Sequence, residues 1–480
     1  MEKLNRLQSG IEGLDALLKG GLVSGASYII QGRPGSGKTI LANQLGFHHA
    51  RNGGRVLVAT LLAESHDRLF QFLSTLSFFD ASRVGAEIQF VSAFDTLENE
   101  GLDEVVKLLR REISRQKATV MVVDGLLNAR SKADSPIDTK KFISELQGHA
   151  AFAGCTVLFL TSSRLDDGSP EHTMVDGVIE MGEELFGTRS VRRIQLRKTR
   201  GSGALTGLHE CEITNDGLVV YPRLESLYGR PSAPDSADLT RIPSGITSLD
   251  AILGGGLHSS SVTLVMGPSG IGKTTLGLKF LSESTVDAPG LHFGFYESPQ
   301  RLQLKGLSLG IDLQQMQDSG ALSIAWQPTT EGLLDGLGAR LLGLVEEKGI
   351  KRLFIDSLSG MTRVSTNPAR ITDFYSALMN ELRARGVTVF ATWEMHDLFG
   401  SEVSSPASEL SSIADNLMLM RFFEIQSELR RTLSILKVRD SFYDPSLLEV
   451  VIRDQAVDLR KVSRNAPSVV SNSALPGSAF

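Results

Sequence analysis

The chain carries Gly32-Arg33-Pro34-Gly35-Ser36-Gly37-Lys38-Thr39, and it carries the same pattern again as Gly267-Pro268-Ser269-Gly270-Ile271-Gly272-Lys273-Thr274. Both stretches match G-x-x-x-x-G-K-[ST], in which the glycines let backbone N–H groups approach phosphate oxygens closely. Each follows a short apolar run and precedes a helical pattern, which is the context in which this loop holds a nucleotide. The sequence therefore predicts two nucleotide sites on one chain.

The two loops belong to a longer internal repeat. Ser9-Gly10-Ile11 recurs as Ser244-Gly245-Ile246, and the same offset relates Lys38 to Lys273. A register kept over this distance indicates duplicated domains, because a solenoid would need several shorter units. We expect domains at 1–227 and 241–462, a linker rich in Pro, Ser and Asp at 228–240, and a flexible tail at 463–480.

Short β-rich apolar runs alternate with amphipathic helical stretches in each copy. The runs lie at 27–31, 55–61, 119–124 and 156–161 in the first copy, and at 262–266, 291–296, 352–356 and 388–392 in the second. This alternation predicts an α/β fold in which each copy has a mainly parallel sheet flanked by helices.

Composition narrows the class of protein. The 480 residues are 41% hydrophobic and 22% charged, with 49 Lys plus Arg against 55 Asp plus Glu, and the formal net charge is -6. The chain has no overall excess of positive charge that would attract nucleic acid, which argues against a dedicated nucleic-acid-binding protein. Cys155 and Cys211 are far apart, which indicates neither a zinc site nor a disulfide framework. No apolar run is long enough for a membrane span, so we expect a cytoplasmic protein.

The loop residues predict binding of ATP with Mg²⁺. Lys38 and Lys273 are expected to meet the β- and γ-phosphates during catalysis, and the hydroxyls of Thr39 and Thr274 to bind magnesium. A second magnesium contact is expected from Asp124 and Asp356, which each end a buried apolar strand. The alternative for these aspartates is capping of a loop. The nucleotide-binding residues are expected to be Gly32, Gly35, Ser36, Gly37, Lys38 and Thr39, and Gly267, Gly270, Ile271, Gly272, Lys273 and Thr274.

Hydrolysis also needs a base that polarises the attacking water. Glu64 and Glu297 are the candidates, because each closes the strand that follows the first helix of its copy. The alternative is a surface glutamate that caps the next helix.

Taken together, these motifs resemble those of the KaiC-like double-domain ATPases and autokinases of the RecA superfamily, over about residues 5–462. The resemblance implies two tandem RecA-like P-loop domains and a homo-oligomer, a hexamer with ATP, that has a KaiB-like protein partner. Lys198-Thr199-Arg200-Gly201 and Lys437-Val438-Arg439-Asp440 look like the family's Lys-x-Arg-Gly segment. By that resemblance Lys198, Arg200, Lys437 and Arg439 would contact ATP bound by the neighbouring subunit.

The family's second domain phosphorylates itself on an adjacent Ser-Thr pair before a strand. Ser411 and Ser412 occupy the matching positions here, ahead of an apolar strand at 417–420, and the first copy has no such pair. The family's two consecutive glutamates are reduced to one in each copy, since Ala63 precedes Glu64 and Tyr296 precedes Glu297.

Three functions follow from these motifs. The leading one is a ring-forming ATPase and serine autokinase that serves as a switch for protein partners. The second is a DNA-dependent ATPase of the RecA or RadA kind, against which the net charge stands. The third is a scaffold whose assembly depends on nucleotide but which turns over little ATP.

Overall fold

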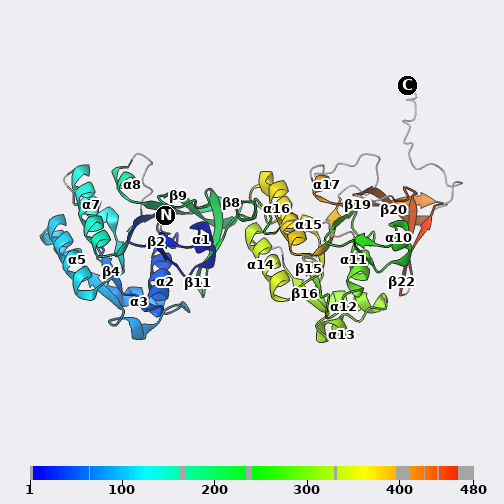
Figure 1. Cartoon of the computed structure of the whole chain (residues 1–480), viewed down its shortest axis with the longest axis horizontal. Coiled ribbons are helices and arrows are strands. Elements are labelled where there is room, and N and C mark those ends of the chain that lie inside the picture. Colours follow the sequence, from blue (N-terminus) through cyan, green and yellow to red (C-terminus); the bar gives the residue numbers. More distant parts are fainter. Residues whose placement is uncertain are drawn as a thin grey trace, which may run out of the picture. The chain divides into compact units, whose positions relative to one another are not determined.

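The computed structural model describes residues 4–63, 65–133, 135–162, 169–233, 240–328, 332–395, 410–425, 428–439, 443–453 and 455–462. The chain divides into two compact units, Met1–Leu227 and Tyr228–Phe480. Each unit is an α/β body built on a nine-stranded sheet (Figure 1). The expected tail at 463–480 and part of the expected linker, 234–239, lie outside the described residues.

The sheet of the first unit has the strand order β11-β10-β9-β8-β3-β7-β6-β4-β5. The six strands β8, β3, β7, β6, β4 and β5 pair in parallel with their neighbours in this order. β9, β10 and β11 continue the sheet beyond β8 with antiparallel pairing. Its strands are β3 (Ser27–Gln31), β4 (Val56–Thr60), β5 (Ile88–Ser92), β6 (Val120–Asp124), β7 (Thr156–Thr161), β8 (Gly177–Phe186), β9 (Arg189–Thr199), β10 (Leu208–Thr214) and β11 (Gly217–Tyr221). β1 (Arg6–Leu7) and β2 (Leu22–Val23) form a separate small pair.

Helices cover both faces of this sheet because successive strand residues point to opposite sides. On one face Ile30 packs with Leu41 and Leu45 of α2 (Lys38–Arg51). On the other, Ile29 packs with Phe142 of α7 (Pro136–Phe152). The remaining helices are α1 (Glu12–Leu17), α3 (His66–Leu73), α4 (Phe94–Asn99), α5 (Leu102–Gln116), α6 (Leu126–Ser131), α8 (Pro170–Met174) and α9 (Leu224–Leu227).

The second unit repeats this arrangement with the strand order β16-β15-β17-β18-β14-β19-β20-β21-β22. Its strands are β14 (Val262–Gly267), β15 (Gly290–Gly294), β16 (Leu322–Trp326), β17 (Arg352–Asp356), β18 (Thr388–Glu394), β19 (Asn416–Ile425), β20 (Glu428–Val438), β21 (Leu448–Arg453) and β22 (Ala456–Lys461), beside a small pair of β12 (Arg241–Ile242) and β13 (Leu257–His258). Its helices are α10 (Thr247–Ile252), α11 (Lys273–Ser282), α12 (Pro299–Ser308), α13 (Leu313–Asp318), α14 (Leu334–Glu347), α15 (Leu358–Thr362), α16 (Ile371–Ala384) and α17 (Leu410–Ile413).

The predicted fold class is confirmed, since both sheets are mostly parallel and flanked by helices. The predicted strands match β3, β4, β6 and β7, and β14, β15, β17 and β18, within one or two residues at each end. The antiparallel extension of each sheet was not foreseen in detail. Among the described residues no helix combines the length and the apolar character that crossing a membrane requires.

Candidate nucleotide sites

Each glycine-rich loop lies at the carboxyl end of the central strand of its sheet and leads into a helix, β3 into α2 and β14 into α11. The residue that caps each helix is a glycine in the left-handed region, Gly37 with φ of 101° and Gly272 with φ of 109°. A side chain at Gly32 would also collide with the sheet, because its Cβ would lie 2.1 Å from the carbonyl oxygen of Met181. The loops therefore need glycine for both backbone conformation and close approach.

The loop lysines are buried and point into their own loops. Lys38 Nζ donates to the carbonyl oxygens of Gly32 at 2.8 Å and Arg33 at 2.9 Å. Lys273 Nζ donates to those of Gly267 and Pro268, both at 2.7 Å. Burial lowers the pKa of both lysines, although nearby carboxylates act in the opposite direction. A phosphate in the loop would supply a stronger acceptor for each ammonium group.

A threonine hydroxyl and a strand-end aspartate meet beneath each loop. Thr39 Oγ1 donates to Asp124 Oδ2 at 3.3 Å, and Thr274 Oγ1 donates to Asp356 Oδ2 at 2.7 Å. These partners are more than eighty residues apart in the chain, and only the folded sheet brings them together. A hydroxyl and a carboxylate at this spacing supply the oxygen ligands that magnesium prefers.

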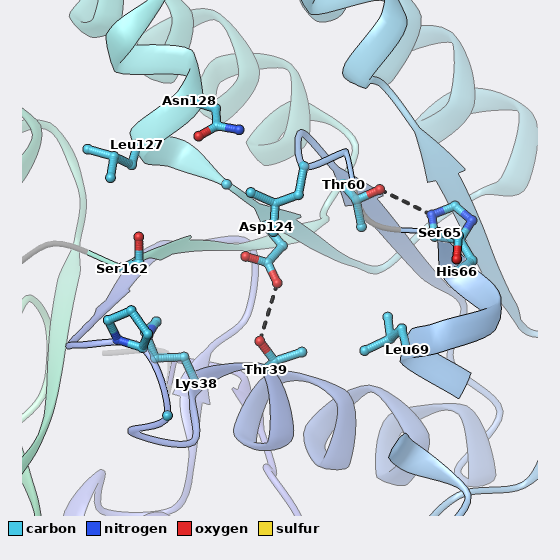
Figure 2. Close-up of a pocket in the computed structure, with 14 residues that line it drawn as sticks. Lys38, Thr39, Thr60, Ser65, His66, Leu69, Asp124, Leu127, Asn128 and Ser162 are labelled. Atoms are coloured by element: carbon cyan, nitrogen blue, oxygen red, sulfur yellow. Dashed lines mark hydrogen bonds between the residues drawn. The ribbon is translucent and has the colours of Figure 1, made fainter. Parts of the chain in front are cut away.

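In the first copy the loop borders a cavity of about 210 Å³. Figure 2 shows Thr39 hydrogen-bonded to Asp124 and, to the right of this pair, Thr60 hydrogen-bonded to His66. His66 Nε2 lies 3.1 Å from Thr60 Oγ1, and burial lowers the pKa of this imidazole. The cavity is lined by Pro34, Gly35, Lys38, Thr39, Thr60, Leu62, Ser65, His66, Leu69, Asp124, Gly125, Leu127, Asn128 and Ser162.

Two residues distinguish the second site from the first. Thr392 is fully buried, and its Oγ1 donates to Asp356 Oδ1 at 2.7 Å, so that each carboxylate oxygen of Asp356 accepts one threonine hydroxyl. In the first copy the residue paired with Asp124 on the neighbouring strand is Leu160, which has no hydroxyl.

The second difference is a carboxylate at the end of β18. Glu394 pairs with Gly267, the first glycine of the loop, and its charge acts on Lys273. Alternation along β18 places Glu394 on the same face as Thr392. The corresponding position in the first copy is Ser162, one residue beyond β7. The second site is therefore more acidic than the first.

The candidate bases differ in what the structure describes. Glu297 Oε1 accepts from Lys305 Nζ of α12 at 2.8 Å, and about a third of each side chain is exposed. β15 ends at Gly294, so Glu297 lies three residues beyond this strand and directly before Ser298, the N-cap residue of α12. Glu64 lies outside the described residues.

The side chains of both sites fit Mg-ATP. Each offers a buried ammonium, a cradle of backbone N–H groups at a helix start, and a hydroxyl–carboxylate pair for a hard cation. The Ile271 side chain is buried in the core, whereas the hydroxyl of Ser36, at the matching position of the first loop, lies 3.5 Å from Lys38 Nζ. Among the predicted residues, the structure brings together the loop, the threonine and the aspartate of each copy.

The Lys-x-Arg residues lie elsewhere in their domains. Lys198 Nζ donates to the carbonyl oxygens of His172 at 2.7 Å and Val175 at 2.6 Å, and Arg200 lies 3.6 Å from Asp176. Lys437 Nζ donates to the carbonyl oxygens of Ser411 at 3.0 Å and Ala414 at 2.7 Å. Arg439 pairs with Asp415 at 3.1 Å. Ser411 and Ser412 lie on α17 beside Lys437, away from Lys273.

Sequence reasoning missed His66, Thr392, Glu394 and Lys305. His66 follows Glu64 by two residues and could have been found as a polar group near the expected base. The other three come from the strand beside β14 and from α12, and their roles depend on strand register and helix packing that no motif encodes.

Comparison with known proteins agrees with this geometry. The family model described as KaiC ATPase matches residues 7–225 and 242–463. The circadian clock oscillator protein KaiC of a Picosynechococcus species is 27% identical over 485 residues, which cover 98% of this chain and 92% of that protein. The clock oscillator protein KaiC 1 of a Synechocystis species is 27% identical over 491 residues, with coverage of 98% and 92%. The KaiC protein of Thermosynechococcus vestitus is 27% identical over 493 residues, again with coverage of 98% and 92%.

Proposed function

Because the chain belongs to the KaiC family of ATPases, we propose that each of its two copies binds Mg-ATP and hydrolyses it. The observation that carries this proposal is the threonine–aspartate pair beneath each phosphate loop. Lys38 and Lys273 would hold the phosphates, and the pairs Thr39–Asp124 and Thr274–Asp356 would hold the metal. Magnesium bound there would offset the negative charge of the phosphate oxygens.

Glu297 and Glu64 are proposed to orient and deprotonate the attacking water. Glu297 follows the strand next to β17, whose last residue is Asp356, so its carboxylate lies at the same sheet edge as the phosphate loop. Lys305 restrains this carboxylate, which limits the orientations it can take. A base held in one orientation near its water is more effective than a mobile one.

We further propose that the nucleotides lie between subunits of a ring, a hexamer in the presence of ATP. Lys198 and Lys437 hold segments at the amino ends of β8 and β19, whereas the phosphate loops follow the carboxyl ends of β3 and β14. In parallel strands the amino and carboxyl ends lie on opposite sides of the sheet. Along the five residues of β3 they are about 13 Å apart. A lysine at the amino ends of the strands is therefore placed to contact ATP bound by another chain, as the family resemblance implies.

The second copy is proposed to phosphorylate itself on Ser411 or Ser412. Ser411 of the acceptor pair contacts Lys437, whose charge would favour a phosphate product, and Arg439 pairs with Asp415, three residues after Ser412. Phosphorylation would add about −1.5 to −2 charges per site and would change the surface presented to protein partners.

The test combines solution mass, turnover and phosphate mapping. Purified chain is expected to shift to a hexameric mass with Mg-ATP, to release ADP and phosphate, and to gain phosphate on the 411–412 peptide. Turnover without phosphate on that peptide would remove the autokinase part and leave the ATPase part. Nucleotide binding without turnover would favour the scaffold function.

A further inference from the structure

One set of contacts occurs twice, around α8 in the first copy and around α17 in the second. Lys198 closes the end of α8 through the carbonyl oxygens of His172 and Val175, as Lys437 closes α17 through those of Ser411 and Ala414. An aspartate follows each helix. Asp176 Oδ2 accepts from the backbone N–H of Ser27 at 3.0 Å, and Asp415 Oδ2 accepts from that of Val262 at 2.9 Å.

The strands that follow confirm this equivalence. The backbone N–H of Arg200 donates to the carbonyl oxygen of Asp176 at 2.8 Å, as that of Arg439 donates to Asp415 at 2.9 Å. Lys198 pairs with Val178 across β8 and β9, and Lys437 pairs with Leu417 across β19 and β20. Both ladders shift register directly after that pair. The segment around α8 and the segment around α17 therefore correspond residue by residue.

By this correspondence Thr173 occupies the position that Ser412 has in the second copy, and His172 occupies the position of Ser411. Both Thr173 and Ser412 are exposed. His172 is buried, and its Nε2 lies 2.7 Å from Gln31 Oε1. A hydroxyl group thus stands at the second of the two acceptor positions in the first copy, although no serine or threonine pair marks it in the sequence.

Two cations contact the backbone carbonyl oxygen of Thr173, whereas in the second copy Lys437 contacts that of Ser411 and Arg439 pairs with Asp415. Lys198 Nζ lies 3.4 Å and Arg200 Nη2 lies 3.5 Å from the carbonyl oxygen of Thr173. Burial and the neighbouring Arg200 lower the pKa of Lys198, so an added anion would relieve the repulsion between the two cations. A phosphate on the Thr173 hydroxyl would therefore gain charge-assisted hydrogen bonds.

The nucleotide loop of the same copy is not the natural donor for Thr173. Val175, directly after α8, packs with Ile29 and Phe142 in the core under α7, whereas α2 covers the other face of the sheet. Figure 1 shows α8 beside α7. The sheet thus lies between Thr173 and the helix that follows its own phosphate loop.

We propose that Thr173 is a second phosphoacceptor, phosphorylated by ATP held in the first copy of another chain. Thr173 Oγ1 forms a bond to the γ-phosphorus, the bond from that phosphorus to the β–γ bridging oxygen breaks, ADP leaves, and the hydroxyl proton passes to solvent. This inference rests on the proposed function, because it requires the first copy to bind ATP in an assembly.

The experiment is phosphate mapping of the full chain after incubation with Mg-ATP. Thr173 falls in the tryptic peptide 165–189, which also contains Ser169 and Thr188, so fragment ions must locate the phosphate. We expect phosphate on residue 173 in the parent chain and in the Thr173→Ser variant, which keeps a hydroxyl. Thr173→Val keeps the shape of the side chain but has no hydroxyl, and it should lose this phosphate. In Lys273→Ala, phosphate on Thr173 should persist while the 411–412 peptide loses it.

The outcomes separate this inference from the proposed function. Phosphate on the 411–412 peptide with none on Thr173 would overturn the inference alone, as would a 165–189 peptide that keeps its phosphate in Thr173→Val. ATP turnover with both peptides unmodified would overturn the inference and the autokinase proposal together. Absence of turnover and of both phosphates would overturn the proposed function as a whole.

Discussion

Thr392→Val removes one of the two hydroxyls that hold Asp356 under the second phosphate loop. Valine keeps the shape of the fully buried Thr392 side chain and removes its hydroxyl, which donates to Asp356 Oδ1 at 2.7 Å and lies 3.5 Å from the carbonyl oxygen of Ile355. Without that donor, the carboxylate can rotate away from the position in which it would meet magnesium. We expect the second copy to bind Mg-ATP more weakly.

The size of the effect follows from the type of bond. A hydrogen bond to a charged group contributes about 1.5–3 kcal/mol, and each ~1.4 kcal/mol is a factor of ten in binding. Thr274 still donates to Oδ2 of Asp356, so the carboxylate keeps part of its orientation. We therefore expect a loss near the lower end, about tenfold in magnesium affinity, in line with residues that orient metal ligands elsewhere.

The assay is binding of a fluorescent ATP analogue as magnesium is titrated. The binding phase that disappears in Lys273→Ala belongs to the second copy, and this phase should move to about tenfold higher magnesium in Thr392→Val. Leu160→Val is the matched control, because Leu160 occupies the same position beside Asp124 and has no hydroxyl to lose. Its binding phases should stay in place.

An unchanged magnesium dependence in Thr392→Val, with unfolding temperature also unchanged, would refute the reasoning. It would mean that Asp356 either does not approach the metal or is held by Thr274 alone. A shift of the same size in Leu160→Val would attribute the effect to packing and not to the hydroxyl.

Three further predictions concern the loops, the base and a buried histidine. Lys38→Ala and Lys273→Ala should each remove one nucleotide per chain in equilibrium binding, with assembly impaired mainly by Lys38→Ala; loss of assembly only in Lys273→Ala would reverse that assignment. Glu297→Gln should keep ATP binding while product release from the second copy falls some hundreds- to thousands-fold, as expected for a base that lowers the barrier by about 3–5 kcal/mol; an undiminished rate would place the base elsewhere. Burial lowers the pKa of His292 in the folded chain, so as pH falls below about 6.5 this imidazole is protonated more readily in the unfolded chain. The free energy of unfolding should therefore decline from pH 7 toward pH 5. His292→Val, which installs the residue that the first copy has as Val58, should flatten this decline in thermal unfolding of the second unit, and an unaltered slope would contradict the assignment.

The contiguous parts of both sites could be predicted from the sequence. A loop such as Gly32–Thr39 fixes its own backbone through glycine spacing, and Asp124 ends an apolar run that can only be a buried strand. The parallel core of each sheet followed from the same runs. These features are local, so a short window of residues determines them.

What escaped prediction depends on pairing across the fold. Thr392 meets Asp356 only because β18 lies beside β17 in a particular register, and Lys305 reaches Glu297 only after α12 packs. The strands beyond β8 carry many charged residues, among them Arg192 and Arg193, which weakens the apolar pattern that reveals a strand. The correspondence of Thr173 with Ser412 rests on the matching contacts of Lys198 and Lys437, since His172-Thr173 and Ser411-Ser412 share no residue.

The proposed phosphate donor and acceptor lie at opposite ends of the strands of one sheet, and this placement has a consequence for symmetry. Asp415 is bound to the first residue of β14, and Gly267 at the other end of that strand begins the phosphate loop, so about 17 Å of rigid strand separates the two ends. An isologous dimer would need one self-complementary patch that contains both edges. The proposed transfer from one chain to the next would instead join two different surfaces, a heterologous contact that closes only as a cyclic ring and otherwise grows into a filament. In a closed ring every acceptor has a donor, and no subunit is terminal.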